Sequence, residues 1–190
     1  MALTTLDPNT ALLVVDLQKG IVSMPTAHPA SAVIQKASTL LEAFRRHHLP
    51  VVLINVDASA PGRTEAAPRV RDFPAGWTDF IPELNQQPGD HVVTKRSWGA
   101  FTNTGLAEHL KSKEVTQVVV IGVATSAGVE STARHAHELG YNVTLAIDAM
   151  TDMNADAHTN SITRIFPRIA ETGTTEAILQ LLEATHAWKG

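Results

Sequence analysis

The stretch from Val118 to Asp148 constrains the fold more than any other part of this 190-residue chain. Its pattern predicts a buried strand at residues 118–121 and a sharp turn at 122–128. A helix follows up to about residue 139, and then a second buried strand at 143–147. Small residues fill the turn, namely Gly122, Ala124, Ser126, Ala127 and Gly128. A helix that begins just after a parallel strand presents free backbone N–H groups and a positive dipole end. The turn therefore suits an anionic or polar ligand, or a nucleophile.

The rest of the chain continues this alternation of strands and helices. We expect further strands at residues 10–17, 51–56, 91–94 and 168–171, and further helices at 30–48, 103 or 104 to 113, 155–166 and 174–187. The first two strands are unbroken apolar runs, which is typical of a parallel sheet covered on both faces. We predict an α/β fold: a three-layer α/β/α sandwich with a doubly wound, mostly parallel six-stranded sheet, in a single domain over residues 1–190.

Composition excludes several classes of protein. Hydrophobic residues make up 44% of the chain and charged residues 18%, which excludes a disordered chain. The net charge is -4 and the basic residues are scattered, so no nucleic-acid partner is expected. The chain has no cysteine, which excludes disulfides and a thiolate nucleophile. The first residues lack a secretory pattern and no run reaches the length of a membrane span, so we expect a cytoplasmic protein with no membrane partner.

Polar or flexible residues follow several predicted strands, at one rim of the expected sheet. Asp16, Asp57, Lys95 and the 122–128 turn all lie at or just after strand ends, where doubly wound sheets bind ligands. Asp16 is either a turn residue or a partly buried carboxylate whose raised pKa suits general acid or base catalysis. Lys95 is either an exposed rim residue or a partner of Asp16. The Pro- and Gly-rich segment 58–88 is interpreted as a lid or binding loop.

Other chemistry-bearing residues show weaker patterns. The nine histidines form no HExxH motif and no Asp-x-His motif at the end of a predicted strand, so we expect no metal, with His158 the best exception. No GxSxG motif surrounds Ser126 or Ser131, which are interpreted first as capping or packing residues. Aromatic residues close to Lys95 in sequence, or in the irregular loop, are either core residues or pocket walls: Trp77, Trp98 and Phe101.

Taken together, these segments resemble the isochorismatase-like hydrolase superfamily, also called the cysteine hydrolases, which includes nicotinamidases and N-carbamoylsarcosine amidases. The resemblance extends over nearly the whole chain. It is carried by ALLVVDLQKGI (11–21), VVLINVDAS (51–59), VTKRSWGAFTNTGL (93–106), the segment 118–152 with its GVAT turn, and the Ala157-His158 pair.

The resemblance implies an α/β/α fold with a catalytic Asp16, a catalytic Lys95 and a non-proline cis peptide at Val123–Ala124. It also implies a small-molecule substrate, a homo-oligomer, and no metal or organic cofactor. We expect substrate contacts from Gln18, Trp98, Phe101, Val123, Ala124, Ser126 and Ala127.

One departure from the family pattern bears on the reaction. Amidase members begin the helix with a nucleophilic Cys where this chain has Gly128, so the nucleophile position is vacated. Isochorismatases proper are similar in having Gly there, and they cleave a vinyl ether by protonation, which implies Asp16 as the acid. Three hypotheses follow: vinyl-ether cleavage, amide hydrolysis by water that Asp16 activates, and a catalytically silent protein that binds a small ligand or a partner.

Overall fold

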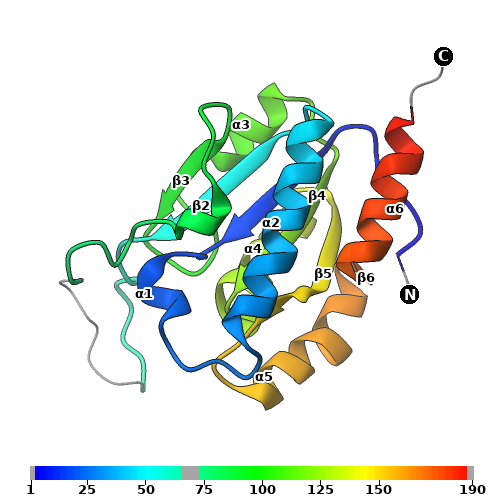
Figure 1. Ribbon diagram of the computed structural model, residues 1–190. Helices are drawn as coiled ribbons and strands as arrows, with labels where there is room; N and C mark the ends of the chain where they lie inside the picture. Colours follow the sequence, from blue (N-terminus) through cyan, green and yellow to red (C-terminus); the bar gives the residue numbers. More distant parts are fainter. Residues whose placement is uncertain (1–2, 66–72, 188–190) are drawn as a thin grey trace.

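The computed structural model describes residues 3–65 and 73–187, and its centre is a six-stranded sheet (Figure 1). The strands are β1 (Thr10–Val15), β2 (Val51–Val56), β3 (His91–Lys95), β4 (Gln117–Val123), β5 (Asn142–Thr151) and β6 (Glu171–Gly173). They run in the order β3-β2-β1-β4-β5-β6, and every neighbouring pair is parallel. The predicted α/β fold with a doubly wound six-stranded sheet is confirmed.

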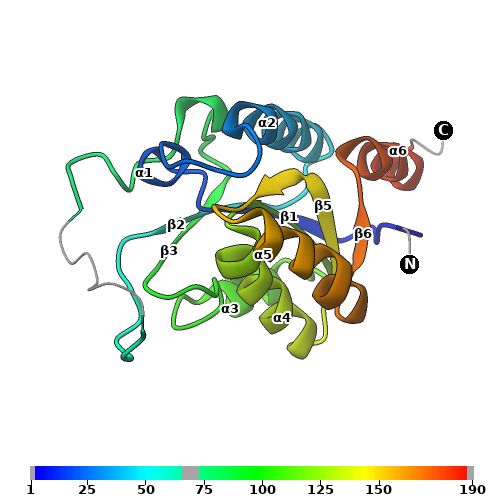
Figure 2. The ribbon, with the colours of Figure 1, turned by 90° about the horizontal axis from the view of Figure 1, so that it is seen from below.

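Helices cover both faces of this sheet, so the protein has three layers. They are α1 (Lys19–Val22), α2 (Ala30–Arg46), α3 (Leu106–Ser112), α4 (Glu130–Glu138), α5 (Ala155–Asn160) and α6 (Thr175–His186). Figure 2 shows α1, α2 and α6 on one face and α3, α4 and α5 on the other. None of the helices among the described residues is long and apolar enough to cross a bilayer.

The unbroken apolar run of β1 feeds two hydrophobic cores at once. Side chains alternate between the faces of a strand, so Leu12 and Val14 join the core under α2 and α6, while Leu13 and Val15 join the core under α3 and α4. All six residues of β1 are buried. Burial on both faces explains why the run shows no polar alternation.

The strand order reverses between β1 and β4, which lie side by side in the sheet. The chain leaves the carboxyl end of β1 toward α1 and α2, and the carboxyl end of β4 toward α4 on the opposite face. The connections therefore diverge at this point and leave a crevice at the rim. Asp16, directly after β1, and the turn after β4 lie there.

Two predicted boundaries are wrong. The last strand is Glu171–Gly173, not residues 168–171, because Phe166–Arg168 forms a 3-10 turn with a proline at its start. The helix for which Asn103 or Thr104 was the expected cap begins at Leu106, because Gly105 is left-handed and occupies the N-cap position.

Two other elements differ in length from their predicted bounds. Strand β5 continues past residue 147 to Thr151, because its pairing with β4 shifts register between Val120 and Gly122 and then resumes. The expected helix 155–166 is α5 followed by a π-helical turn, Ser161–Ile165, and the 3-10 turn. The closing helix is confirmed, with the Thr174 side chain capping it by accepting a hydrogen bond from the Ala177 N–H at 3.2 Å.

Gly122 provides a test of how closely β1 and β4 approach. Its φ is +120°, and a Cβ there would lie 2.0 Å from the Val15 carbonyl oxygen, whereas Gly140 has a φ of +90° and open space. We expect Gly140→Ala to lose about 1–2 kcal/mol from the unfavourable φ alone. Gly122→Ala should lose more than twice as much in urea unfolding, because the methyl group also pushes two core strands apart. Equal losses would contradict this explanation.

Candidate active site

Asp16 and Lys95 form a buried ion pair at the rim. Asp16 follows β1 directly, and Lys95 is the last residue of β3, so the long lysine side chain reaches past the intervening strand β2. Lys95 Nζ donates to Asp16 Oδ2 at 2.7 Å and to the Ser97 carbonyl at 3.2 Å. Only 5% of Asp16 and 2% of Lys95 are exposed. Asp16 and Lys95 are therefore partners in a buried pair, and not a turn residue and an exposed rim residue.

The Asp16 carboxyl group has a raised pKa. Burial raises its pKa to about 6, against the opposing effect of the Lys95 charge and hydrogen bond. Its Oδ1 atom is buried and accepts no hydrogen bond from any described residue. One carboxyl oxygen is thus held by Lys95, and the other has no hydrogen-bond partner among the described residues.

The turn after β4 is the second part of the site. The peptide between Val123 and Ala124 is cis, as the family resemblance implied, and the turn Thr125–Val129 is π-helical before α4 begins. The Asp152 carboxylate accepts hydrogen bonds from Ser126 N at 2.7 Å and Ser126 Oγ at 2.8 Å. His158 Nδ1 lies 2.8 Å from Thr125 Oγ1. Asp152, directly after β5, and His158, within α5, therefore hold this turn in place.

Gly128 brings the turn directly against the ion pair. A Cβ at this residue would lie 3.1 Å from Asp16 Oδ2 and 3.7 Å from Lys95 Nζ. It would also lie 3.0 Å from Val15 Cγ1, which is tight contact. Any side chain at residue 128 would point at the two charged groups.

A pocket of about 320 Å³ opens over these elements. Its lining consists of Asp16, Ile21, Val56, Ala58, Ser59, Phe73, Trp77, Lys95, Trp98, Val123, Ala124, Ala127, Gly128 and Met153. The rings of Phe73 and Trp77 stack with centroids 4.0 Å apart and planes 11° apart. The described part of this lining is thus mainly apolar and aromatic, and its charged groups are Asp16 and Lys95. Its volume suits a small molecule.

The structure brings most of the predicted site residues into this pocket. Asp16, Lys95, Trp98, Val123, Ala124, Ala127 and Gly128 all line it. Trp98 is 65% exposed, so it forms an outer wall and not part of the core.

Three expected substrate contacts lie elsewhere. Gln18 is fully buried and its amide bonds to the backbone of Val56. Phe101 is in the core under α3 and α4, and Ser126 bonds to Asp152. These residues are close in sequence to pocket residues, but their side chains do not line the pocket.

Several lining residues were missed by sequence reasoning. The irregular 58–88 segment was predicted to be a lid or binding loop, and it supplies Ala58, Ser59, Phe73 and Trp77 to the lining, while its residues 66–72 lie outside the described residues. Ile21 and Met153 carry no sequence signal, because isolated apolar residues after a motif are equally typical of the core.

The remaining candidates have other surroundings. Asp57 pairs with Arg96 at 3.3 Å on the surface. His158 is buried, and its ring lies 4.6 Å from that of His28. Across residues 3–65 and 73–187, no three metal-ligating side chains form a cluster that could hold an ion.

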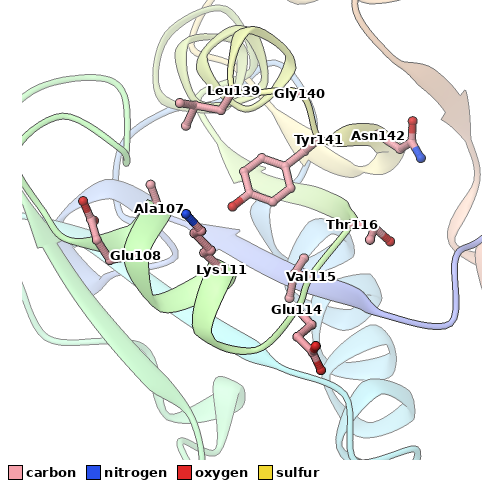
Figure 3. Close-up of a pocket in the computed structure, with 10 residues that line it drawn as sticks. All are labelled: Ala107, Glu108, Lys111, Glu114, Val115, Thr116, Leu139, Gly140, Tyr141 and Asn142. Carbon is pink, nitrogen blue, oxygen red and sulfur yellow. The ribbon is translucent and has the colours of Figure 1, made fainter.

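A larger hollow of about 760 Å³ lies at the opposite rim, where β4 and β5 begin (Figure 3). Figure 3 shows the Tyr141 ring between Leu139, after α4, and Lys111 of α3. The charged residues around it, Glu108, Lys111 and Glu114, are exposed. Burial and the nearby Glu108 raise the pKa of Tyr141. The described residues of this hollow include no buried ion pair like that of Asp16 and Lys95.

Fold and site together define an α/β protein with a buried acid–base pair where the strand order reverses. Comparison with known proteins places it within a family. The Isochorismatase domain matches residues 10–177, so the chain belongs to the isochorismatase family of hydrolases.

Individual relatives extend over almost the whole chain. The isochorismatase family protein YwoC of Bacillus subtilis is 40% identical over 178 residues, which is 90% of this chain and 93% of YwoC. Nicotinamidase 3 of Arabidopsis thaliana is 32% identical over 165 residues, 80% of this chain and 79% of that protein. The structure of an isochorismatase family protein from Burkholderia thailandensis matches with a TM-score of 0.89 and 38% identity, over 94% of this chain and 98% of that one.

The ion pair makes a direct prediction. Lys95 lowers the pKa of Asp16 against the effect of burial, so Lys95→Met should raise that pKa above about 6. The measurement is a carbon-13 NMR titration of the Asp16 carboxyl group. Lys19→Met, which removes an exposed ion pair with Asp79, serves as the matched control and should leave Asp16 unchanged. An Asp16 pKa that stayed the same or fell in Lys95→Met would show that Lys95 does not balance this charge.

Proposed function

We propose that this protein hydrolyses a small molecule by proton transfer from Asp16, without a covalent enzyme intermediate. The observation that carries the proposal is the buried Asp16 carboxyl group, with one oxygen bound to Lys95 and the other unpartnered among the described residues. A carboxyl group with a pKa of about 6 can give or take a proton near neutral pH.

The absence of cysteine from the sequence supports a non-covalent route. By its resemblance to the amidase members of the family, residue 128 is the position of their nucleophile, and here it is glycine. Among the described lining residues the one hydroxyl group is that of Ser59, which follows β2 and does not belong to the turn with Gly128, and Ser126 is bound to Asp152. Water is therefore the nucleophile that the proposal requires.

The reaction we favour is the cleavage of a vinyl ether, of which isochorismate is the concrete example. The Asp16 carboxyl group gives its proton to the terminal vinyl carbon, and the ether oxygen shares the positive charge of the resulting oxocarbenium ion. The carboxylate, which Lys95 continues to hold, stabilises that ion. Water adds to the oxocarbenium carbon and loses a proton to Asp16. The hemiketal then separates into an alcohol and a ketone, and the net change is the addition of one water.

Amide hydrolysis is the second candidate, and the similarity to nicotinamidase 3 favours it. In this reaction the ionised Asp16 takes a proton from water as the water attacks the carbonyl carbon, and the same proton then passes to the leaving nitrogen. The two candidates need Asp16 in opposite protonation states at the start, so the pH dependence separates them.

The pH dependence of kcat/KM is the test. Vinyl-ether cleavage needs protonated Asp16, so activity on isochorismate, followed by pyruvate release, should be highest below pH about 6 and fall above it. Amide hydrolysis needs ionised Asp16, so ammonia release from a panel of amides should rise as the pH passes about 6. Asp16→Asn should lose about a hundredfold or more in either reaction.

The same experiments can reject the proposal. Wild-type-like turnover by Asp16→Asn would exclude the mechanism. Ligand-dependent thermal stabilisation without turnover on either panel would favour the third hypothesis, a catalytically silent binding protein.

Gly128 gives an independent prediction. Gly128→Ala places a methyl group 3.1 Å from Asp16 Oδ2, so it should displace the carboxyl group or the substrate and lower kcat/KM by at least about tenfold. Gly99→Ala is the matched control, because a Cβ there meets nothing closer than 3.6 Å. Activity retained in Gly128→Ala would mean that the reacting atoms lie away from this turn.

A further inference from the structure

Gln18 lies two residues after Asp16 and uses its whole amide group to bind backbone. Its Oε1 accepts a hydrogen bond from Val56 N at 2.8 Å, and its Nε2 donates to the Val56 carbonyl at 3.1 Å and to the Trp77 carbonyl at 3.3 Å. The side chain is fully buried and does not line the pocket. Both of its amide N–H donors are occupied by backbone carbonyls, so they are not available to a substrate.

Both partners of this amide line the pocket. Val56 is the last residue of β2, and Trp77 belongs to the irregular loop between β2 and β3. The Gln18 amide thus joins two segments of the pocket lining that are separate in the sequence.

The chain around Gln18 reinforces the hold on Trp77. Gly20 N donates to the same Trp77 carbonyl at 2.9 Å, and Gln18 forms an antiparallel bridge with Phe80. The indole ring of Trp77 lies against Gly20, where a Cβ would be only 2.1 Å from the ring. A second amide, Asn55 Nδ2, donates to the Thr78 carbonyl at 3.0 Å, which fixes the neighbouring residue to β2.

We infer that Gln18 is a positioning residue, which fixes Trp77 relative to Asp16 and thereby sets how tightly the substrate binds. The inference rests on the proposed hydrolase function. Asp16 and Gln18 belong to one short segment, so the proton-transfer group and the tether of the aromatic wall are held by the same piece of chain. Loss of the tether should release Trp77 while the Asp16–Lys95 pair stays intact, because neither charged group contacts the Gln18 amide.

The test uses Gln18→Met, which keeps the length of the side chain and removes all three hydrogen bonds. For an otherwise wild-type chain we expect KM to rise by about fivefold to tenfold, with kcat and the pH dependence of kcat nearly unchanged. A role limited to folding would instead lower kcat through the folded fraction and leave KM unchanged.

A second measurement needs no substrate. The chain has three tryptophans, and substituting Trp98→Phe and Trp188→Phe leaves Trp77 as the only one. In this background Gln18→Met should make the Trp77 fluorescence more accessible to acrylamide quenching. This readout decides the placement of Trp77 even if the proposed hydrolase activity fails.

Gln18→Glu is the conservative variant. It keeps the acceptor for Val56 N, and its protonated form regains one donor, so its effect on quenching should be smaller than that of Gln18→Met and should shrink at lower pH. It also serves if Gln18→Met does not fold. Unchanged quenching in the folded variant would overturn the inference, and so would increased quenching with an unchanged KM.

Discussion

The buried ion pair between Asp16 and Lys95 is the interaction on which the site depends. Removing two charges from water costs several kcal/mol per ion in proteins, and only short contacts and additional hydrogen bonds offset this cost. The 2.7 Å contact and the Ser97 carbonyl satisfy the lysine in part, but Asp16 Oδ1 finds no partner among the described residues. The unsatisfied oxygen is a feature more typical of function than of stability. The parallel sheet makes the pair possible, since the carboxyl ends of β1 and β3 meet at one rim.

Buried and partly buried polar side chains around the pocket hold backbone in place. Asp152 binds the turn after β4, and Gln18 and Asn55 bind the loop that carries Trp77. The surface left for a ligand is then mainly apolar and aromatic, with the acid–base pair at its base. This division agrees with a site in which a few polar groups perform the chemistry and fixed apolar walls orient the molecule.

Elements whose interactions are local in the sequence were predicted well, and those that depend on distant residues were not. Strands β1 and β2 and helix α6 were predicted closely, because burial on both faces or a helical repeat is recorded in consecutive residues. The last strand was misplaced because Ile169 and Ala170, which suggest a strand, pack instead against the core under α3 and α4. Phe101 illustrates a similar limit, because an aromatic residue near Lys95 suits a pocket wall and a core equally well, and the structure places its side chain in the core under α3 and α4.

The sequence by itself determined the class of fold, the rim that carries Asp16 and Lys95, and the exclusion of a thiol nucleophile. These depend on apolar runs, on residue order and on composition, all of which are local or countable. Only the tertiary structure decided that Asp16 Oδ1 has no hydrogen-bond partner among the described residues, that Gly128 faces the ion pair, and that the Gln18 amide binds the Trp77 carbonyl. Each of these depends on the direction of a side chain and on a neighbour tens of residues away, which no local pattern records.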